Sequence, residues 1–181
     1  MKRLSLPLSA ADVQGLRAGE QVLLSGEIFT ARDAAHQRMC ALLEKGENLP
    51  CDIEGAGIYY VGPTPAAPGR AVGSAGPTTS TRMDKFAPKL IERGLRAMIG
   101  KGNRSAAVVE AMQRYGCVYF AAIGGAGALL AQRIKSLEVI AWEELGCEAL
   151  RRIRVEDFPA IVAIDVHGNN LYTQGPREWQ G

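Results

Sequence analysis

Hydroxyl groups and one arginine gather in residues 76–84, GPTTSTRMD, where they could bind a small anion. A proline suits the first position of a helix, so the stretch predicts a helix that begins near Thr78 and ends near Gly94. Arg82 would share a helix face with Thr78. Backbone N–H groups, the hydroxyls of Thr78 and Thr79, and the guanidinium would then converge, which suits a carboxylate or a phosphate. An ordinary serine- and threonine-rich helix cap explains the same residues.

A second group of charged residues follows an apolar run, residues 22–29, that predicts a strand. Thr30 would cap the next helix, and Asp33 would complete a capping-box-like pair with it. Arg32 and His36 lie one helical turn apart. Because the helix dipole disfavours an arginine in the first turn, we expect Arg32 to serve binding rather than helix stability. A solvated arginine beside a capping histidine is the alternative.

Two further turns carry polar side chains. Lys101 lies between two glycines after a strand predicted over residues 95–99. Glycines let a ligand approach the backbone closely, although a surface turn fits the same pattern. His167 and Asn169 follow the last predicted strand, where turn chemistry alone explains them as well as hydrogen bonding near a site does.

The elements that must position these side chains alternate between strand and helix. Strands are predicted over residues 1–8, 21–29, 58–61, 95–99, 117–123, 137–142, 150–155 and 160–166. Helices are predicted over residues 10–17, 31–45, 78–94, 105–115 and 126–133. Strands linked by helices imply a parallel part of the sheet, and the strand-rich ends imply a more antiparallel layer. We therefore expect an α/β protein with a single domain over residues 1–181.

Composition restricts the class of protein. The chain has 181 residues, 47% apolar content and a formal charge of +2, which fit one soluble domain without a general attraction to nucleic acid or membrane. Its apolar runs are too short for a spanning helix, and its N-terminus lacks a signal-peptide core. Four cysteines without a pairing pattern fit a reducing compartment, so we expect a cytoplasmic protein.

Glycine-rich segments raise the possibility of a nucleotide site. Residues 123–127 follow a strand and open a helix, but Leu130 stands where a dinucleotide fingerprint needs glycine or alanine. Residues 100–102 lack the upstream glycine and the following Ser/Thr of a phosphate-binding loop. A dicarboxylate site or close packing suits both segments better. A small-anion or nucleotide-binding module remains the non-enzyme alternative.

Five segments, in this order, resemble the β subunit of the iron–sulfur hydro-lyases, the family of the class I fumarases and L-tartrate dehydratase. They are GEIFTARDAAHQRM (26–39), VGSAGPTTSTRMDKF (72–86), IGKG (99–102), AAIGGAGAL (121–129) and IDVHGNNLY (164–172). The resemblance extends over nearly the whole chain. It implies a three-layer β/β/α swivelling domain with a mixed sheet.

The resemblance also implies a division of labour between two subunits. An α subunit carries three cysteines that hold a [4Fe–4S] cluster with one open iron, and the β subunit closes over it. The cysteines here are isolated, at positions 40, 51, 117 and 147, so we expect no metal ligands in this chain. We expect a hetero-oligomer with the α subunit in the active state, and no hydratase activity without it.

Substrate-binding roles follow from the same resemblance. Arg32, Arg82 and Lys101 align with positions that bind the carboxylates of a small dicarboxylate, and Thr79 lies among them. Holding both carboxylates would position the substrate, and in model reactions correct positioning supplies roughly 7–11 kcal/mol. These residues are therefore the expected clamps.

Catalytic roles are implied for three further residues. Thr78 aligns with the threonine proposed to transfer the proton; a neutral hydroxyl needs help there from the helix N-terminus, Arg82 or a partner carboxylate. Asp33 and His36 are assigned to support, orienting Arg32 or the partner's acid, with His36 as a direct acid the alternative.

The expected reaction is the reversible hydration of fumarate to L-malate, because TARDAAH resembles the fumarase form of the motif. Conversion of tartrate to oxaloacetate by L-tartrate dehydratase is the alternative. The substrates malate and tartrate differ by one hydroxyl, which a single polar contact could recognise. A non-catalytic assembly subunit is a third possibility, but it would not need both arginines and the lysine.

Overall fold

A computed structural model describes residues 1–122 and 127–178. The strands of this part are β1 (Lys2–Leu6), β2 (Gln21–Thr30), β3 (Gly57–Tyr59), β4 (Ala97–Gly100), β5 (Val118–Ala122), β6 (Ile134–Ala141) and β7 (Leu150–Ile164). The α-helices are α1 (Ala10–Gln14), α2 (Asp33–Glu44), α3 (Ala87–Glu92), α4 (Ala106–Tyr115), α5 (Gly127–Ala131) and α6 (Leu171–Glu178). Two 3₁₀ helices are η1 (Ser80–Met83) and η2 (Glu143–Glu148).

The described strands form one mixed sheet in the order β1-β2-β3-β4-β5-β7-β6. Neighbours from β1 to β5 are parallel, and β7 is antiparallel to β2, β5 and β6. Because β7 bonds to both β2 and β5, five strands close into a barrel and leave β1 and β6 outside it. The expected α/β class and mixed sheet are confirmed.

The two ends of the chain pair differently from one another. β6 and β7 are antiparallel, as expected for the strand-rich tail. β1 and β2 are parallel, contrary to the antiparallel layer expected at the N-terminus, because the connection through α1 carries the chain back to the starting edge. The two strands predicted over 150–155 and 160–166 are one strand, β7, which bends at Asp157 (φ 48°) without ending.

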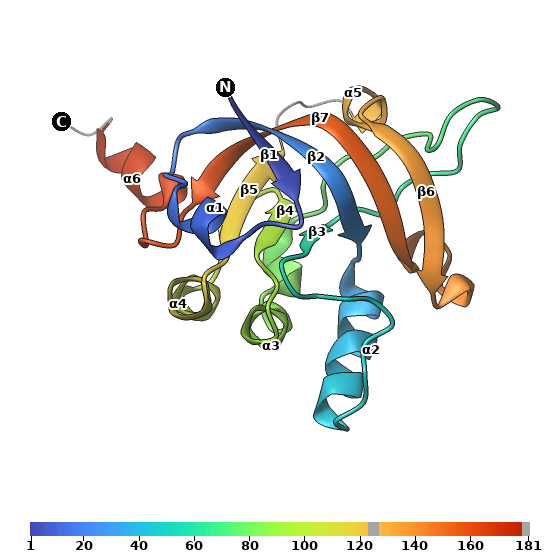
Figure 1. Cartoon of the computed structure of the whole chain (residues 1–181), viewed down its shortest axis with the longest axis horizontal. Helices are drawn as coiled ribbons and strands as arrows, with labels where there is room; N and C mark the ends of the chain where they lie inside the picture. Colours follow the sequence, from blue (N-terminus) through green and yellow to red (C-terminus); the bar gives the residue numbers. More distant parts are fainter. Residues whose placement is uncertain (123–126, 179–181) are drawn as a thin grey trace.

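Two apolar cores lie on the two faces of the central strands. Tyr59 of β3 and Ile99 of β4 belong to a core shared with β1, α1 and β7. Their neighbours Ile58 and Met98 belong to a second core with α2, α3 and α4. Strands buried on both faces read as continuous apolar runs, as these do. Figure 1 shows α2, α3 and α4 together on one side of the strands.

Helix α6 is absent from the sequence expectations, and it contains Pro176, a residue type that is unfavourable inside a helix. Its start is stabilised by Asn170, whose side-chain oxygen accepts a hydrogen bond from the Tyr172 backbone N–H at 2.9 Å. In residues 1–122 and 127–178, we find no helix with the length and apolar character needed to span a bilayer.

Candidate functional site

The predicted clamp residues follow the carboxyl ends of three neighbouring parallel strands. Arg32 lies two residues after β2, and Lys101 directly follows β4. Between them, the Thr78 backbone N–H donates to the carbonyl of Tyr60, which follows β3, at 2.7 Å. Ligands of α/β sheets commonly bind beyond the carboxyl ends of parallel strands. The fold therefore brings these residues to one edge of the sheet.

The helix predicted to begin at Thr78 is wrong. Thr79 forms a parallel bridge with Lys101, and the Ser80 backbone N–H donates to the Lys101 carbonyl at 2.9 Å. This pairing keeps the segment extended, so only η1 follows, and α3 begins at Ala87. Thr78 and Arg82 consequently share no α-helical face, and no α-helix N-terminus lies at Thr78 to bind an anion.

Close packing explains why a glycine precedes Lys101. A Cβ atom on Gly100 would lie only 2.0 Å from the Ser80 Oγ atom. Any side chain at position 100 would therefore have to displace the Ser80 side chain, and the Tyr60 ring atom Cδ2 would also lie within 2.9 Å of the added Cβ. From the sequence, the two glycines beside the lysine are expected to allow ligand approach. Gly100 instead allows the close approach of Ser80, and Gly102 adopts a positive φ of 85°.

Arg82 and Asp33 join η1 to the start of α2. Both Nε and Nη2 of Arg82 lie 3.0 Å from Asp33 Oδ2. The side chains are 51% and 35% exposed, so this ion pair contributes little stability, about 0.2–1 kcal/mol. Its geometric effect is more important, because it fixes the direction of the guanidinium.

The capping box predicted between Thr30 and Asp33 is wrong. Thr30 is the fully buried last residue of β2, and it pairs with Tyr59 on one side and Arg151 on the other. Because the strand pairs on both sides, the helix starts later, and Arg32 is the N-cap without a side-chain capping bond. The Asp33 carboxylate is thereby available to Arg82.

Glu148 lies beside Arg32 at the candidate site, and the sequence expectations lack it. Its Oε1 atom lies 4.0 Å from Arg32 Nε, and the two side chains are 31% and 24% exposed. A Cβ on Gly62 would lie 3.0 Å from Arg32 Nη1, so this glycine leaves room for the guanidinium. Glu148 belongs to η2, far from Arg32 in the sequence, and no motif marks it.

His36 lies fully buried beneath this edge. Its Nδ1 atom is 2.8 Å from the Arg32 carbonyl oxygen, which makes Nδ1 the protonated nitrogen of the neutral ring. The ring packs edge-on against Tyr60, with centroids 5.3 Å apart. Burial lowers the pKa of His36 to about 4, and the nearby Arg104 guanidinium acts in the same direction. The ring is therefore neutral at pH 7 and contacts the backbone of Arg32.

Buried polar atoms without a hydrogen-bond partner gather at the same edge. In the described residues they include Thr30 Oγ1, Arg32 Nε, Asp33 Oδ1, His36 Nε2 and Glu148 Oε1. Leaving one buried polar group unpaired costs about 1–3 kcal/mol, so each such group requires an explanation. A site completed by a ligand, water or a partner protein explains why they cluster here.

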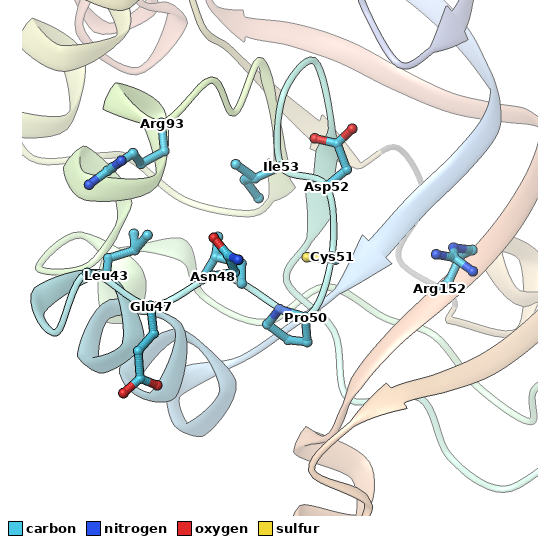
Figure 2. Close-up of a pocket in the computed structure, with 11 residues that line it drawn as sticks. Leu43, Glu47, Asn48, Pro50, Cys51, Asp52, Ile53, Arg93 and Arg152 are labelled. Atoms are coloured by element: carbon cyan, nitrogen blue, oxygen red, sulfur yellow. The ribbon is translucent and has the colours of Figure 1, made fainter.

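A cavity of about 640 Å³ lies elsewhere, at the opposite end of α2. Figure 2 shows its lining, mostly from the loop over residues 46–53, with Arg93 and Arg152 at opposite ends. None of the predicted site residues lines it. Burial raises the pKa of its Cys51 thiol to about 11, so the thiol is protonated and poorly reactive. We place the candidate site where the charged groups converge rather than at this hollow.

His167 and Asn169 form a turn around Asp165. In the sequence this turn lies more than 60 residues after Lys101. Asp165 accepts hydrogen bonds from both of their backbone N–H groups and from the Asn169 side chain. His167 Nε2 lies 3.2 Å from the Gln14 carbonyl. Turn chemistry accounts for these contacts.

The four cysteines are free and separate. Cys40 and Cys117 are buried, Cys51 is half-buried and Cys147 is exposed. Burial raises the pKa of Cys117 to about 12, so its thiol is protonated. Within residues 1–122 and 127–178, no group of three or more His, Cys, Asp or Glu side chains could hold a metal ion. These residues therefore do not fit an iron–sulfur cluster. Residues 123–126 of the glycine-rich motif lie outside the described part.

Comparisons with known proteins identify the family of this chain. The family model described as fumarase C-terminus matches residues 2–175. The chain is 44% identical over 153 residues to the aerobic class I fumarate hydratase of Escherichia coli, covering 83% of this chain and 28% of that enzyme. It is 40% identical over 158 residues to fumarate hydratase 2 of Leishmania major, covering 86% and 28%. It is 35% identical over 181 residues to the L(+)-tartrate dehydratase subunit beta of Escherichia coli, covering 97% and 89%.

Proposed function

We propose that this chain, which belongs to the fumarase C-terminal family of class I hydro-lyases, is the β subunit of a two-subunit enzyme. The chain spans 28% of the length of the fumarate hydratases described above, but 89% of the tartrate dehydratase beta subunit. The match over most of that subunit supports a β subunit that works with an α subunit in a hetero-oligomer, and from the composition of the chain we propose the cytoplasm as its compartment.

The observation that carries the proposal is that the segments with Arg32, Arg82 and Lys101 are joined at one edge of the sheet, through the Thr79–Lys101 bridge and the Arg82–Asp33 pair. Three cations within one edge suit a substrate with two carboxylates. Lys101 is fixed through its backbone to Ser80, and Arg82 through its side chain to Asp33. A positioned substrate needs such clamps, because orientation lowers the barrier to reaction.

Dehydration removes a proton from one carbon while hydroxide leaves the neighbouring carbon, and a double bond forms between them. We assign the proton transfer to the hydroxyl of Thr78. The backbone N–H of this residue donates a hydrogen bond to the Tyr60 carbonyl. A neutral hydroxyl is a poor base, and the only helix that starts near Thr78 in the described residues is the short 3₁₀ helix η1, not an α-helix whose dipole could assist it. Assistance would therefore come from Arg82 or from a carboxylate of the partner, and Asp33 supports the site by orienting Arg82.

The α subunit would hold the [4Fe–4S] cluster, which would supply the Lewis acid for the departing hydroxide. The described residues of the present chain offer no ligand set for that cluster. This chain would bind and orient the dicarboxylate, hold the proton-transferring hydroxyl and cover the reacting atoms.

L(+)-tartrate is the first candidate substrate, and its dehydration yields oxaloacetate. The match to the tartrate dehydratase beta subunit spans nearly both chains, which places this reading ahead of the fumarate reaction favoured by the sequence motif. Hydration of fumarate to L-malate is the second candidate, because identity to the fumarate hydratases is higher, 44% against 35%.

Co-expression of this chain with an α subunit of the family from the same source, under anaerobic conditions, tests the proposal. Dehydration of tartrate and of malate is followed by ultraviolet absorbance. We expect activity in the pair only, and its loss in Arg82→Ala. Arg3→Ala is the matched control. Arg3 of β1 forms an exposed ion pair with Asp157 of β7, and neither residue belongs to the candidate site. A cluster-loaded complex inactive on both acids would overturn the proposed function.

A further inference from the structure

Arg104 is a fully buried cation behind the candidate site. Its side chain has no exposed surface, and Nε donates to Asp84 Oδ1 at 2.7 Å. Nη2 donates to the Tyr60 hydroxyl at 3.2 Å. The guanidinium also stacks between two aromatic rings, 5.2 Å from the centroid of Tyr60 and 5.0 Å from that of Tyr119. Nη1 lies 3.3 Å from Met98 Sδ, so each nitrogen of the buried guanidinium has a partner.

The first partner, Asp84, fixes the end of the segment that carries Arg82. One carboxylate oxygen of Asp84 accepts from Arg104, and the other accepts from the Ser105 backbone N–H at 2.7 Å. Ser105 is the N-cap of α4. Asp84 thus ties the residue after η1 to the start of a neighbouring helix.

The second partner, Tyr119, joins the two segments on either side of it. Its hydroxyl donates to the Gly102 carbonyl at 2.7 Å, and it lies 2.8 Å from Ser80 Oγ. Gly102 follows Lys101, and Ser80 bonds to Lys101 through its backbone. Tyr119 therefore holds the lysine turn against the threonine segment.

The third partner, Tyr60, supports Thr78. Its carbonyl accepts from the Thr78 N–H, and its ring packs against His36. One guanidinium consequently touches the supports of the lysine, of the second arginine and of the proposed proton-transferring threonine. Arg104 itself is buried and does not reach the open edge.

We propose that Arg104 is a positioning residue, which fixes Thr78, Arg82 and Lys101 relative to one another without touching the substrate. This inference rests on the proposed function. Stability alone explains the buried pair poorly, because apolar residues often replace buried ion pairs without loss of stability. The planar, forked guanidinium, however, can bond Asp84 and Tyr60 while stacking on two rings, and a lysine ammonium cannot.

Two variants test the inference in the complex with the α subunit. Arg104→Lys keeps the charge and loses the fork, and Arg104→Met with Asp84→Asn removes both charges without leaving either unpaired. Misplacement of clamps by about 1 Å can cost about 100-fold in rate, so we expect kcat/KM to fall by about that factor in both. Leu24→Ala, in the other core, is the control: it lowers the unfolding midpoint but leaves kcat and KM unchanged.

Amide hydrogen exchange of the isolated full chain gives a readout that does not depend on activity. We expect faster exchange at the Thr78 and Ser80 amides in both Arg104 variants, whereas the control retains their protection. Unchanged kinetics and exchange in Arg104→Lys would overturn the inference, even where the double variant fails to fold. An inactive wild-type complex would overturn the proposed function only, because the exchange result still decides the role of Arg104.

Discussion

Arg82 Nε and Nη2 both lie 3.0 Å from Asp33 Oδ2, so a residue after β2 determines where a residue of η1 points. Asp33 leaves its other oxygen, Oδ1, buried and without a partner in the described residues. The pair uses one carboxylate oxygen to orient an arginine whose remaining nitrogen can face a substrate.

Asp33→Asn is expected to lower kcat/KM by about 10-fold, because Arg82 loses its charged partner and its orientation. The free energy of unfolding should change by less than about 1 kcal/mol, as for other exposed ion pairs. Steady-state kinetics of the complex and urea unfolding check the two parts. Glu44→Gln, which breaks the Lys89–Glu44 pair at the other end of α2, is the control and should leave kcat/KM unchanged. Wild-type kinetics in Asp33→Asn would contradict the orienting role.

His36 should make the chain less stable in acid. Burial lowers its pKa to about 4 in the folded protein, against 6.5 when unfolded. Between these two pH values the unfolded state binds more protons than the folded state. The free energy of unfolding is therefore not reduced by His36 above pH 6.5, and it decreases as pH falls from 6.5 toward 4. At pH 5 the loss is about 2 kcal/mol. Urea unfolding at pH 7 and pH 5 measures it. His36→Phe should reduce the difference, and an equal difference in both proteins would show that other groups cause it.

Glu148→Gln is expected to strengthen binding of an inert dicarboxylate such as succinate by about threefold. The variant removes a negative charge 4.0 Å from Arg32 Nε, where it competes with a substrate carboxylate. Calorimetric titration of the complex measures the affinity. The matched control is Glu138→Gln. Glu138 lies on β6 and forms an exposed ion pair with Arg152 of β7. Weaker binding in Glu148→Gln would instead mean that Glu148 orients Arg32.

Gly100→Ala should separate Lys101 from the threonine segment, because the added Cβ would meet Ser80 Oγ at 2.0 Å. We expect a loss of about 1–3 kcal/mol in stability, as for other overpacked sites, and a fall in kcat/KM. Gly175→Ala, in α6 where nothing lies within 4 Å, is the control and should not destabilise the chain. Unchanged unfolding and kinetics in Gly100→Ala would show that the contact relaxes freely.

Local patterns predicted much of the fold. The strand before Arg32 and the helix after Ser105 agree with β2 and α4 within a residue or two, because each has a clear apolar period. Closure of the barrel could not be predicted this way, since it depends on β7 pairing with two strands distant in sequence. The sequence predicted two strands where β7 is one. Glu156, Asp157 and Pro159 are of types typical of a turn, but in the structure the strand only bends at Asp157.

The candidate site shows the same division. The residue types and their order predicted a joint site for Arg32, Arg82 and Lys101, and this site stays a prediction. The structure brings the segments that carry them to one edge of the sheet, through the Thr79–Lys101 bridge and the Arg82–Asp33 pair. Their backbone conformation was wrong at Thr30 and Thr78, where pairing with other strands overrides a good capping residue and a helix-starting proline. Glu148 could not be found, because only the folded chain brings η2 beside Arg32.

The pairing of β2 with β7 also determines when this protein can acquire its shape during translation. All of the clamp residues leave the ribosome before β7, which runs from Leu150 to Ile164. Until then one edge of β2 has no partner, and a free strand edge readily pairs with other chains. The nascent chain therefore has a long interval in which its edge needs shielding, and the barrel can close only after most of the polypeptide has been made.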